Sequence, residues 1–362
     1  MATSDFFADS YLEAREKFLK ASQSAGAMLT EHALPKRYGP NGDTLLVDVA
    51  QLGADDPKSL LILISGTHGV EGFCGSGCQV GYLTDRVYEA LPTDARVLLV
   101  HALNPFGFAW LRRVNEDNVD LNRNFQDFNK SLPPSVGYEE FHDYLVPKDW
   151  EGDERVNADA ALQKFIMAKG EKGFQAELTR GQYTRPNGLF YGGREASWSN
   201  RVLRQILTDN VPETVKRLAV LDIHTGLGKP GFGEPIYVGP KNEGYETAKK
   251  WYGLELKSTM QGTSISAAIT GSVADAFPPS SPDREIIYLA LEFGTVSSTV
   301  VLSALRADHW LNAIPNRDTP LRSSIGRQMR DAYYLDVPWW KAAVYGRSVD
   351  FAIRASQALR DR

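Results

Sequence analysis

The chain has 362 residues, of which 43% are hydrophobic, and its formal net charge at pH 7 is −5. A chain of this length can bury a sizeable core, and the length allows one large domain or two ordinary ones. The sequence contains no basic run and no basic–aromatic stripe, so we do not expect a nucleic-acid partner. No apolar stretch reaches the roughly 18 residues of a membrane span, so we expect no membrane partner either.

The N-terminal segment, residues 1–27, predicts a surface helix. It lacks the basic stretch followed by an apolar stretch that marks a signal peptide, so we expect a cytoplasmic protein. The two cysteines, Cys74 and Cys78, lie four residues apart in a predicted helix, which is a poor arrangement for a disulfide. We expect both to be small buried thiols.

Short apolar runs rich in Val, Ile and Leu alternate with helical stretches along the chain. Continuous apolar runs are typical of strands covered on both faces. Their alternation with helices predicts an α/β fold with a mixed, mostly parallel sheet flanked by helices. The predicted strands are 44–50, 60–65, 96–103, 218–224, 235–239 and 286–294, and the predicted helices are 71–84, 197–209, 243–252, 297–312 and 320–334.

Residues 126–193 interrupt this alternation. The segment is charged, contains several Pro and Gly residues, and has one helical stretch at 158–178. It has few apolar residues for a core of its own, so we expect an insertion that packs beside the sheet or over its edge. The chain is therefore predicted to be a single α/β domain, 1–362, with this insertion and a helical C-terminal extension from about 320.

Two histidines follow predicted buried strands, at the position where open α/β sheets place their ligands. The first lies in the stretch GTHGVEG, where His68 and Glu71 would be about one turn apart if a helix begins there. The second, His224, lies in LDIHTGLG, with the same order of apolar strand, histidine and glycine-rich turn. Two histidines and one glutamate are a common ligand set of zinc hydrolases, which leave one position open for water.

His68 and Glu71 could also have a purely structural role. A lone His-x-x-Glu often occurs by chance, and His68 could simply hydrogen-bond a turn. The other histidines lack this context, and His101, inside a predicted strand, is expected to be a satisfied core residue. The zinc patterns H-E-x-x-H and H-x-x-E-H are both absent, so the third ligand has to be remote in sequence.

A loop at 104–125 and a later strand carry the remaining polar residues of interest. Arg113, Asn122 and Arg123 lie in the loop. The alternative interpretation of such a polar loop is a solvated turn without a functional role. Because Asn122 and Arg123 have aliphatic and aromatic neighbours, a guanidinium there needs an anionic partner, and a carboxylate suits it. Glu292 ends the apolar run YLALEFGT, where a carboxylate is costly unless it forms an ion pair or acts as a general base.

The motifs GTHGVEG, NPFGFAWLRR, DLNRNF, LDIHTGLG and LALEFGT occur in this order between about 60 and 295. On these motifs the sequence resembles the zinc carboxypeptidases (carboxypeptidase A-like metallopeptidases), in a bacterial branch similar to the succinylglutamate desuccinylase and aspartoacylase group. The resemblance implies a phosphorylase/hydrolase-like fold and one Zn²⁺ per chain. It also implies site roles: zinc ligands His68, Glu71 and His224, oxyanion stabiliser Arg113, carboxylate ligands Asn122 and Arg123, and general base Glu292. Asp222 could support His224, to which it is close in sequence.

The sequence departs from this family at one position. Carboxypeptidases usually carry a substrate-closing tyrosine between the last zinc ligand and the glutamate, whereas 261–279 contains none. Tyr183 and Arg185 of the insertion are weak candidates for pocket residues, and a Gly/Pro-punctuated connector is an equally good interpretation of that stretch.

The expected function is a zinc-dependent hydrolase of an amide bond next to a free carboxylate, acting on a peptide or small molecule. An N-acyl-amino-acid deacylase with the same site, and a non-catalytic metal-binding module, remain alternatives. A phosphate binder and a serine hydrolase are disfavoured, because neither G-x-x-x-x-G-K-[ST] nor G-x-S-x-G occurs. The sequence does not predict the oligomeric state.

Overall fold

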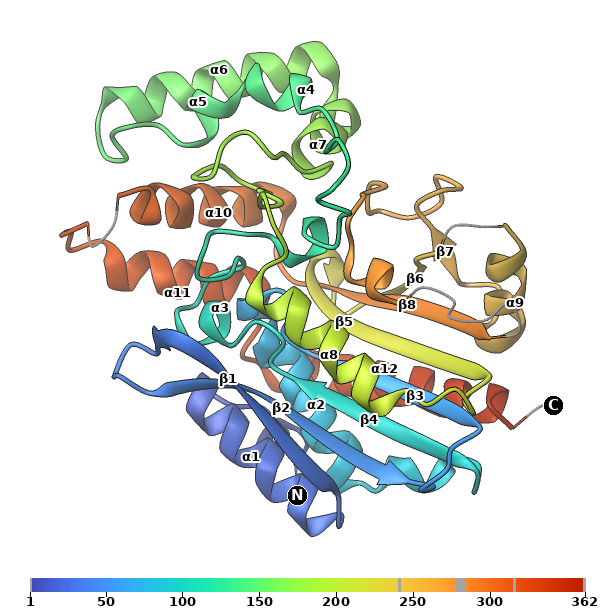
Figure 1. The fold of residues 1–362 in the computed structure, drawn as a ribbon. Coiled ribbons are helices and arrows are strands. Elements are labelled where there is room, and N and C mark those ends of the chain that lie inside the picture. The colour runs from blue at the N-terminus through green and yellow to red at the C-terminus, as the bar shows by residue number, and fades with distance from the viewer. Residues whose placement is uncertain (1, 240–241, 278–283, 315–316, 361–362) are drawn as a thin grey trace.

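The computed structural model describes residues 2–239, 242–277, 284–314 and 317–360. Its centre is one eight-stranded sheet with the strand order β1-β2-β4-β3-β5-β8-β6-β7 (Figure 1). Strands β4, β3, β5 and β8 are parallel to one another, whereas β1 and β2 at one edge, and β6 beside β8, add antiparallel pairs. The predicted mixed α/β fold is therefore confirmed. The strands are β1 (Met28–Tyr38), β2 (Thr44–Gly53), β3 (Ser59–Ile64), β4 (Ala95–His101), β5 (Arg217–Pro230), β6 (Gly233–Tyr237), β7 (Lys257–Ser258) and β8 (Glu285–Gly294).

The central strands are buried on both faces, as their continuous apolar runs predict. Leu61 and Leu63 belong to the cluster under α1 (Tyr11–Ser24), α2 (Gly72–Thr84) and α12 (Pro338–Ala358). Leu60 and Ile62 belong to the cluster under α8 (Trp198–Asn210), on the opposite face. Because neighbouring residues of a strand point to opposite faces, one run of leucine and isoleucine serves both layers. Cys74 and Cys78 are free and buried in α2, as expected.

The segment 126–193 contains four helices, which form a layer at the top of the view in Figure 1. The helical stretch predicted as one element is two helices, because the chain turns at Gly170 with φ +76°. This layer packs on α10 (Ser298–Asn312), and not directly on the sheet that we expected it to flank. The indole of Trp310 donates a hydrogen bond to the carbonyl of Lys148 at 3.1 Å, and its ring stacks on Trp150. The four helices are α4 (Val136–Glu139), α5 (His142–Leu145), α6 (Asp153–Lys169) and α7 (Glu171–Thr179).

The remaining helices are α3 (Pro105–Ala109), α9 (Asn242–Tyr252) and α11 (Arg322–Tyr333). Strand β1 was not predicted, because it is largely exposed and lacks both an apolar run and a regular alternation. In the part of the chain that the structure describes, no helix combines the length and the apolarity that crossing a bilayer requires.

Candidate metal centre

A single tight turn after β3 positions His68 and Glu71. His68 precedes a one-turn 3-10 helix, Gly69–Glu71, that leads directly into α2. The amides of Gly69 and Val70 donate to the carbonyls of Arg113 and Arg112, at 3.0 and 2.9 Å. A Cβ at residue 69 would collide with the backbone of Gly107, so this close approach requires glycine. The docked turn brings His68 and Glu71 next to the Arg113 loop.

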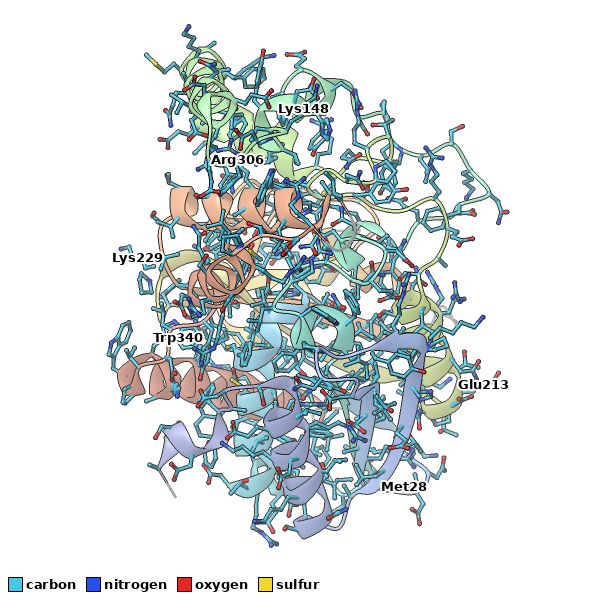
Figure 2. The ribbon with its side chains drawn as sticks, turned by 90° about the vertical axis from the view of Figure 1, so that its left-hand side faces the viewer. Met28, Lys148, Glu213, Lys229, Arg306 and Trp340 are labelled. Atoms are coloured by element: carbon cyan, nitrogen blue, oxygen red, sulfur yellow. The ribbon has the colours of Figure 1, made fainter. Side chains whose placement is uncertain are left out.

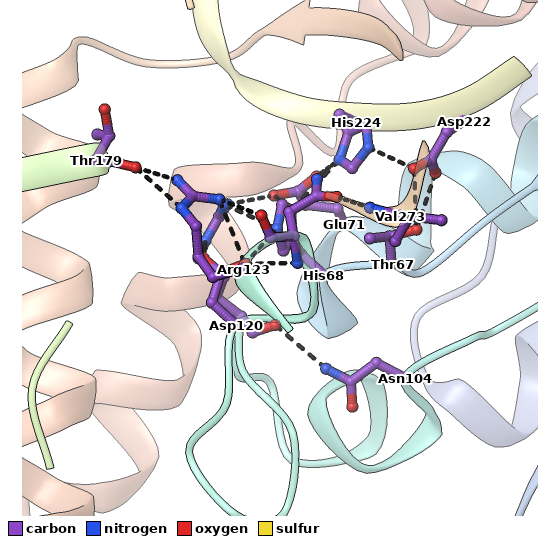
Figure 3. A network of polar contacts seen from close by, with 12 residues as sticks. Thr67, His68, Glu71, Asn104, Asp120, Arg123, Thr179, Asp222, His224 and Val273 are labelled. Carbon is purple, nitrogen blue, oxygen red and sulfur yellow. Dashed lines mark hydrogen bonds and ion pairs between the residues drawn. The ribbon is translucent and has the colours of Figure 1, made fainter. Parts of the chain in front are cut away.

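Three potential ligands converge at the carboxyl end of β3 and β5 (Figure 3). The Nδ1 atom of His68 lies 2.9 Å from Glu71 Oε1, and the Nδ1 atom of His224 lies 3.1 Å from Glu71 Oε2. The two Nδ1 atoms are 3.3 Å apart. One donor atom from each residue lies within 4.8 Å of the others, and all three side chains are buried. Two imidazole nitrogens and a carboxylate oxygen are a donor set that suits zinc.

The opposite nitrogen of each imidazole faces a buried carboxylate. His68 Nε2 lies 3.2 Å from Asp120 Oδ1, and His224 Nε2 lies 2.8 Å from Asp222 Oδ2. Asp222 also accepts hydrogen bonds from Thr67 at 2.9 Å and from the hydroxyl of Tyr288 at 2.7 Å. A carboxylate on the far nitrogen orients an imidazole and directs its other nitrogen toward a metal. The residues around the three donors therefore fit a metal site.

The charges at the centre are strongly coupled. Burial opposes ionisation of Glu71, but His68, His224 and Arg113 together hold the pKa of its carboxyl below the ordinary range. Burial lowers the pKa of His224, and Asp222 and Glu71 raise it well above the ordinary value. A cation and a proton would therefore compete for His224 Nδ1.

Two guanidinium groups flank Asp120. Arg113 donates to Glu71 Oε1 at 2.8 Å and to Asp120 Oδ2 at 3.1 Å, and one of its nitrogens lies 2.8 Å from His68 Nε2. Arg123 donates from Nε to the carbonyl of Thr179 at 3.0 Å and lies 3.7 Å from Asp120 Oδ1. The structure therefore brings both predicted arginines to the centre, with Asp120 as the carboxylate they share.

Asn122 and Glu292 lie on the same cavity. The side-chain oxygen of Asn122 accepts a hydrogen bond from the amide of Val273 at 3.0 Å. Glu292 is the β8 residue paired with His224 of β5, and its carboxylate accepts from the amide of Leu227 at 3.2 Å. Burial, with a contribution from Glu71, raises the pKa of Glu292 to about 8.

A cavity of about 560 Å³ opens at the centre. Six of the seven site residues predicted from the sequence line it, and Glu71 lies at hydrogen-bonding distance behind the two histidines. Their juxtaposition is observed, whereas the roles assigned to them remain predictions. The six are His68, Arg113, Asn122, Arg123, His224 and Glu292.

Two neighbours of the centre were not found from the sequence. Asp120 precedes Asn122 in an ordinary-looking loop, and Tyr333 comes from the last turn of α11, more than 100 residues after His224. Tyr333 lines the cavity, and its ring lies against Gly226. Burial raises the pKa of the Tyr333 hydroxyl, and a hydrogen bond with Arg113 partly offsets this rise. No spacing signal links such a residue to the motifs, so only the fold could reveal it.

The two insertion residues considered as pocket candidates do not line the cavity. Tyr183 donates from its hydroxyl to the carbonyl of Arg123 at 2.8 Å, and so fixes the loop from behind. Arg185 pairs with Glu139 within the insertion. His101 is a buried core residue as expected, stacked on Phe18, but its Nδ1 has no hydrogen-bond partner.

The model of one protein family, described as "Protein of unknown function (DUF2817)", matches residues 7–347. The chain belongs to this family. No curated protein sequence matches it.

The DUF2817 chain is also similar to solved structures. Carboxypeptidase A from Helicoverpa armigera is 14% identical, with 95% of this chain and 74% of that chain covered, at a TM-score of 0.48. A protein from Shewanella frigidimarina NCIMB 400, assigned to succinylglutamate desuccinylase/aspartoacylase, is 16% identical (74% and 64% covered, TM-score 0.38). Murein-tripeptide amidase MpaA from Escherichia coli O157 is 17% identical (80% and 93% covered, TM-score 0.34). Both groups that the sequence resembles are thus among the similar structures.

Proposed function

We propose that this DUF2817 protein is a zinc-dependent hydrolase that cuts an amide bond next to a free carboxylate. The observation that carries the proposal is the convergence of His68, Glu71 and His224 on a cavity that also contains Glu292 and two guanidinium groups. One zinc ion per chain would use the three donors and keep a further position for water.

The chain's own residues can serve each step of such a hydrolysis. A zinc ion held by His68, Glu71 and His224 would supply Lewis acidity and lower the pKa of water. Glu292, buried beside His224, would accept a proton from the attacking water and return it to the leaving amine, because the charge of a bound zinc ion would lower the raised pKa of its carboxyl and keep it ionised. Overall, one water is consumed, the amide C–N bond breaks, and a C–O bond forms, giving a carboxylic acid and an amine.

The guanidinium groups supply electrostatic stabilisation. Arg113 can donate to the carbonyl oxygen as negative charge develops on it, an interaction worth roughly 10²–10³ in rate for a single donor. Arg123 now donates to the carbonyl of Thr179, and a substrate carboxylate would offer it a charged, stronger acceptor. With Asn122, it would fix which bond lies at the centre.

A carboxypeptidase and an N-acyl-amino-acid deacylase would use this site in the same way. The test measures the metal content of the purified chain, followed by hydrolysis of blocked dipeptides and N-acyl amino acids. We expect close to one zinc per chain and hydrolysis of at least one of the two substrate classes. Bound zinc with no hydrolysis of either class would instead favour a non-catalytic metal-binding module.

A further inference from the structure

One residue of the insertion, Phe190, lines the cavity and contacts both arginines of the centre. The Cζ atom of Arg123 lies 5.3 Å from the centroid of the Phe190 ring, and the Cζ atom of Arg113 lies 5.6 Å from it. A guanidinium within about 6 Å of a ring centroid is attracted by the negative face of the ring, and the attraction is strongest where water is excluded. Phe190 is buried, so this one side chain has a favourable interaction with both positive charges.

The backbone of Phe190 is strained. Its φ is +55°, in the left-handed region that bulky side chains rarely adopt. Such a conformation persists where the surrounding chain imposes it, and outliers of this kind cluster at functional sites. Here the amide of Gln182 donates to the carbonyl of Phe190 at 3.1 Å. The side chain of Gln182 also donates to the carbonyls of Arg185 and Leu189, at 2.8 and 3.3 Å. The fold therefore keeps a bulky ring at a position where glycine would fit more easily.

The insertion is anchored to the rest of the chain both far from Phe190 and next to it. At the outer end, Arg306 of α10, labelled in Figure 2, donates to Asp159 at 2.7 Å and to two backbone carbonyls of α5 at 3.0 and 2.7 Å. Near the centre, the carbonyl of Tyr191 accepts a hydrogen bond from the amide of Asp120 at 2.8 Å. These contacts hold the insertion against the metal centre and give the ring of Phe190 a fixed place.

Arg123 keeps part of its hydrogen-bonding capacity for a ligand. Its Nε and one terminal nitrogen donate to the carbonyl of Thr179, the last residue of α7 (Figure 3). The other terminal nitrogen donates to the carbonyl of Asn122 at 3.1 Å. A guanidinium has five N–H groups. One N–H on each terminal nitrogen is therefore left without a hydrogen-bond acceptor among the residues that the structure describes, and this pair can bind the two oxygens of one carboxylate.

The two guanidinium groups share one negative partner. Asp120 lies 3.1 Å from Nε of Arg113 and 3.7 Å from a terminal nitrogen of Arg123. Like charges repel, and a single carboxylate does not neutralise two cations. The ring of Phe190 attracts both groups without adding a negative charge, so the pair is held together and still attracts an anion.

We propose that Phe190 positions the guanidinium groups of Arg113 and Arg123 relative to each other, and so selects substrates in which a free carboxylate lies next to the scissile amide. This inference rests on the proposed function, in which Arg123 binds the carboxylate and Arg113 faces the carbonyl. Phe190 acts through the two arginines and is therefore a positioning residue. A shift of either guanidinium would move the amide away from the metal once the carboxylate is bound.

The test uses three ketones that resemble an N-acyl amino acid but contain no amide bond at the centre. In 3-benzoylpropanoate the carboxylate has the spacing of an α-amino acid, in 5-benzoylpentanoate it lies two methylenes further away, and 3-benzoylpropanamide lacks the charge. Isothermal titration calorimetry measures their binding to the full chain in the presence of zinc. Because hydrogen bonds to a charged group are the strong ones, we expect the wild type to bind 3-benzoylpropanoate at least about tenfold more tightly than either other probe.

Substitutions of Phe190 separate positioning from space filling. Phe190→Leu removes the ring but keeps an apolar side chain, so we expect the affinity for 3-benzoylpropanoate to fall about 5–30-fold. The affinities for the other two probes should change by less than about twofold, because neither depends on the correct spacing of both arginines. Phe190→Tyr keeps the ring and should retain the wild-type affinities.

The control is Phe141→Leu, which removes another buried ring of the insertion, one that does not line the cavity, and it should leave all three affinities unchanged. Phe190→Met is a second variant without a ring. It is included because leucine could prevent folding, which the thermal unfolding curve would reveal.

The outcomes separate this inference from the proposed function. Equal losses for all three probes, or no loss, in a folded Phe190→Leu or Phe190→Met variant would overturn the positioning role. A Phe190→Tyr variant as weak as Phe190→Leu, or a wild type without preference for 3-benzoylpropanoate, would overturn it too. If the preference depends on Phe190 but the wild type hydrolyses neither blocked dipeptides nor N-acyl amino acids, the hydrolase is rejected, and the role of Phe190 in a carboxylate-binding site stands.

Discussion

The two sides of the cavity differ in composition. We call the side at the strand ends the floor and the side formed by helices the roof. The floor consists of the ends of β3, β5 and β8 with their following turns, and it contains buried polar and charged groups that contact one another at 2.7–3.3 Å. The roof consists of α6, α7 and α10, which present aliphatic side chains together with polar ones such as Gln163, Gln175 and Ser303, and Arg306 holds it together at the far end. Bond-breaking chemistry needs donors fixed to within a fraction of an ångström, which strand ends and docked turns provide. The wall of a binding pocket tolerates less exact positioning, which three packed helices can supply.

The comparison implies that changes to the floor should affect turnover on every substrate. Changes to the roof should affect which substrate is preferred. The following predictions run from the largest expected effect to the smallest, and each one could contradict this division.

Removal of the metal should have the largest effect. We expect a chelator to abolish amide hydrolysis, and zinc to restore it, because Lewis acidity cannot come from the side chains alone. Activity would be measured before chelation, after dialysis, and after addition of one equivalent of zinc. Undiminished hydrolysis by protein shown to be metal-free would contradict the proposed role of His68, Glu71 and His224.

Glu292→Gln tests the general base. The amide has a similar size but cannot accept the proton, so we expect kcat to fall by about 10²–10⁴ while zinc is still bound. Glu285→Gln, at the other end of the same strand and outside the cavity, is the control and should retain the wild-type kcat. A normal kcat in the Glu292 variant would remove this residue from the mechanism.

Asp222→Asn tests the support of a metal ligand. The neutral amide holds His224 less firmly and lowers its basicity, so we expect zinc affinity to fall about 10–100-fold. Competition with a chromogenic chelator would give the dissociation constant, with the exposed Asp209→Asn as control. Unchanged zinc affinity would show that the hydrogen bond between Asp222 and His224 does not support metal binding.

Arg306→Met tests the roof. It removes the donors for two carbonyls and for Asp159, and we expect the chain to lose about 1–3 kcal/mol of stability. Amide hydrogen exchange should become faster in 153–179, which Arg306 holds through Asp159. The control is Arg327→Met, which changes an exposed arginine of α11. Unchanged hydrogen exchange in 153–179 would show that Arg306 does not hold the roof together.

The sequence predicted the centre of the molecule well and its periphery less well. Apolar runs long enough to be buried on both faces identified the six strands nearest the core, and a histidine after each of two such runs identified two members of the His–Glu–His cluster. These signals are local, because a strand and the turn that follows it are encoded by consecutive residues. The exposed strand β1, which lacks an apolar run, was missed for the same reason.

What the sequence alone determined, therefore, is the α/β class, the buried strands and the identity of the residues at the centre. Only the tertiary structure decided that Asp120 and Tyr333 join this centre and that the insertion packs on α10. It also showed that residues of the insertion and of α10 line the same cavity as the centre. Contacts of this kind join segments that are far apart in the chain, and their geometry depends on how whole helices pack, which no local pattern of residues encodes.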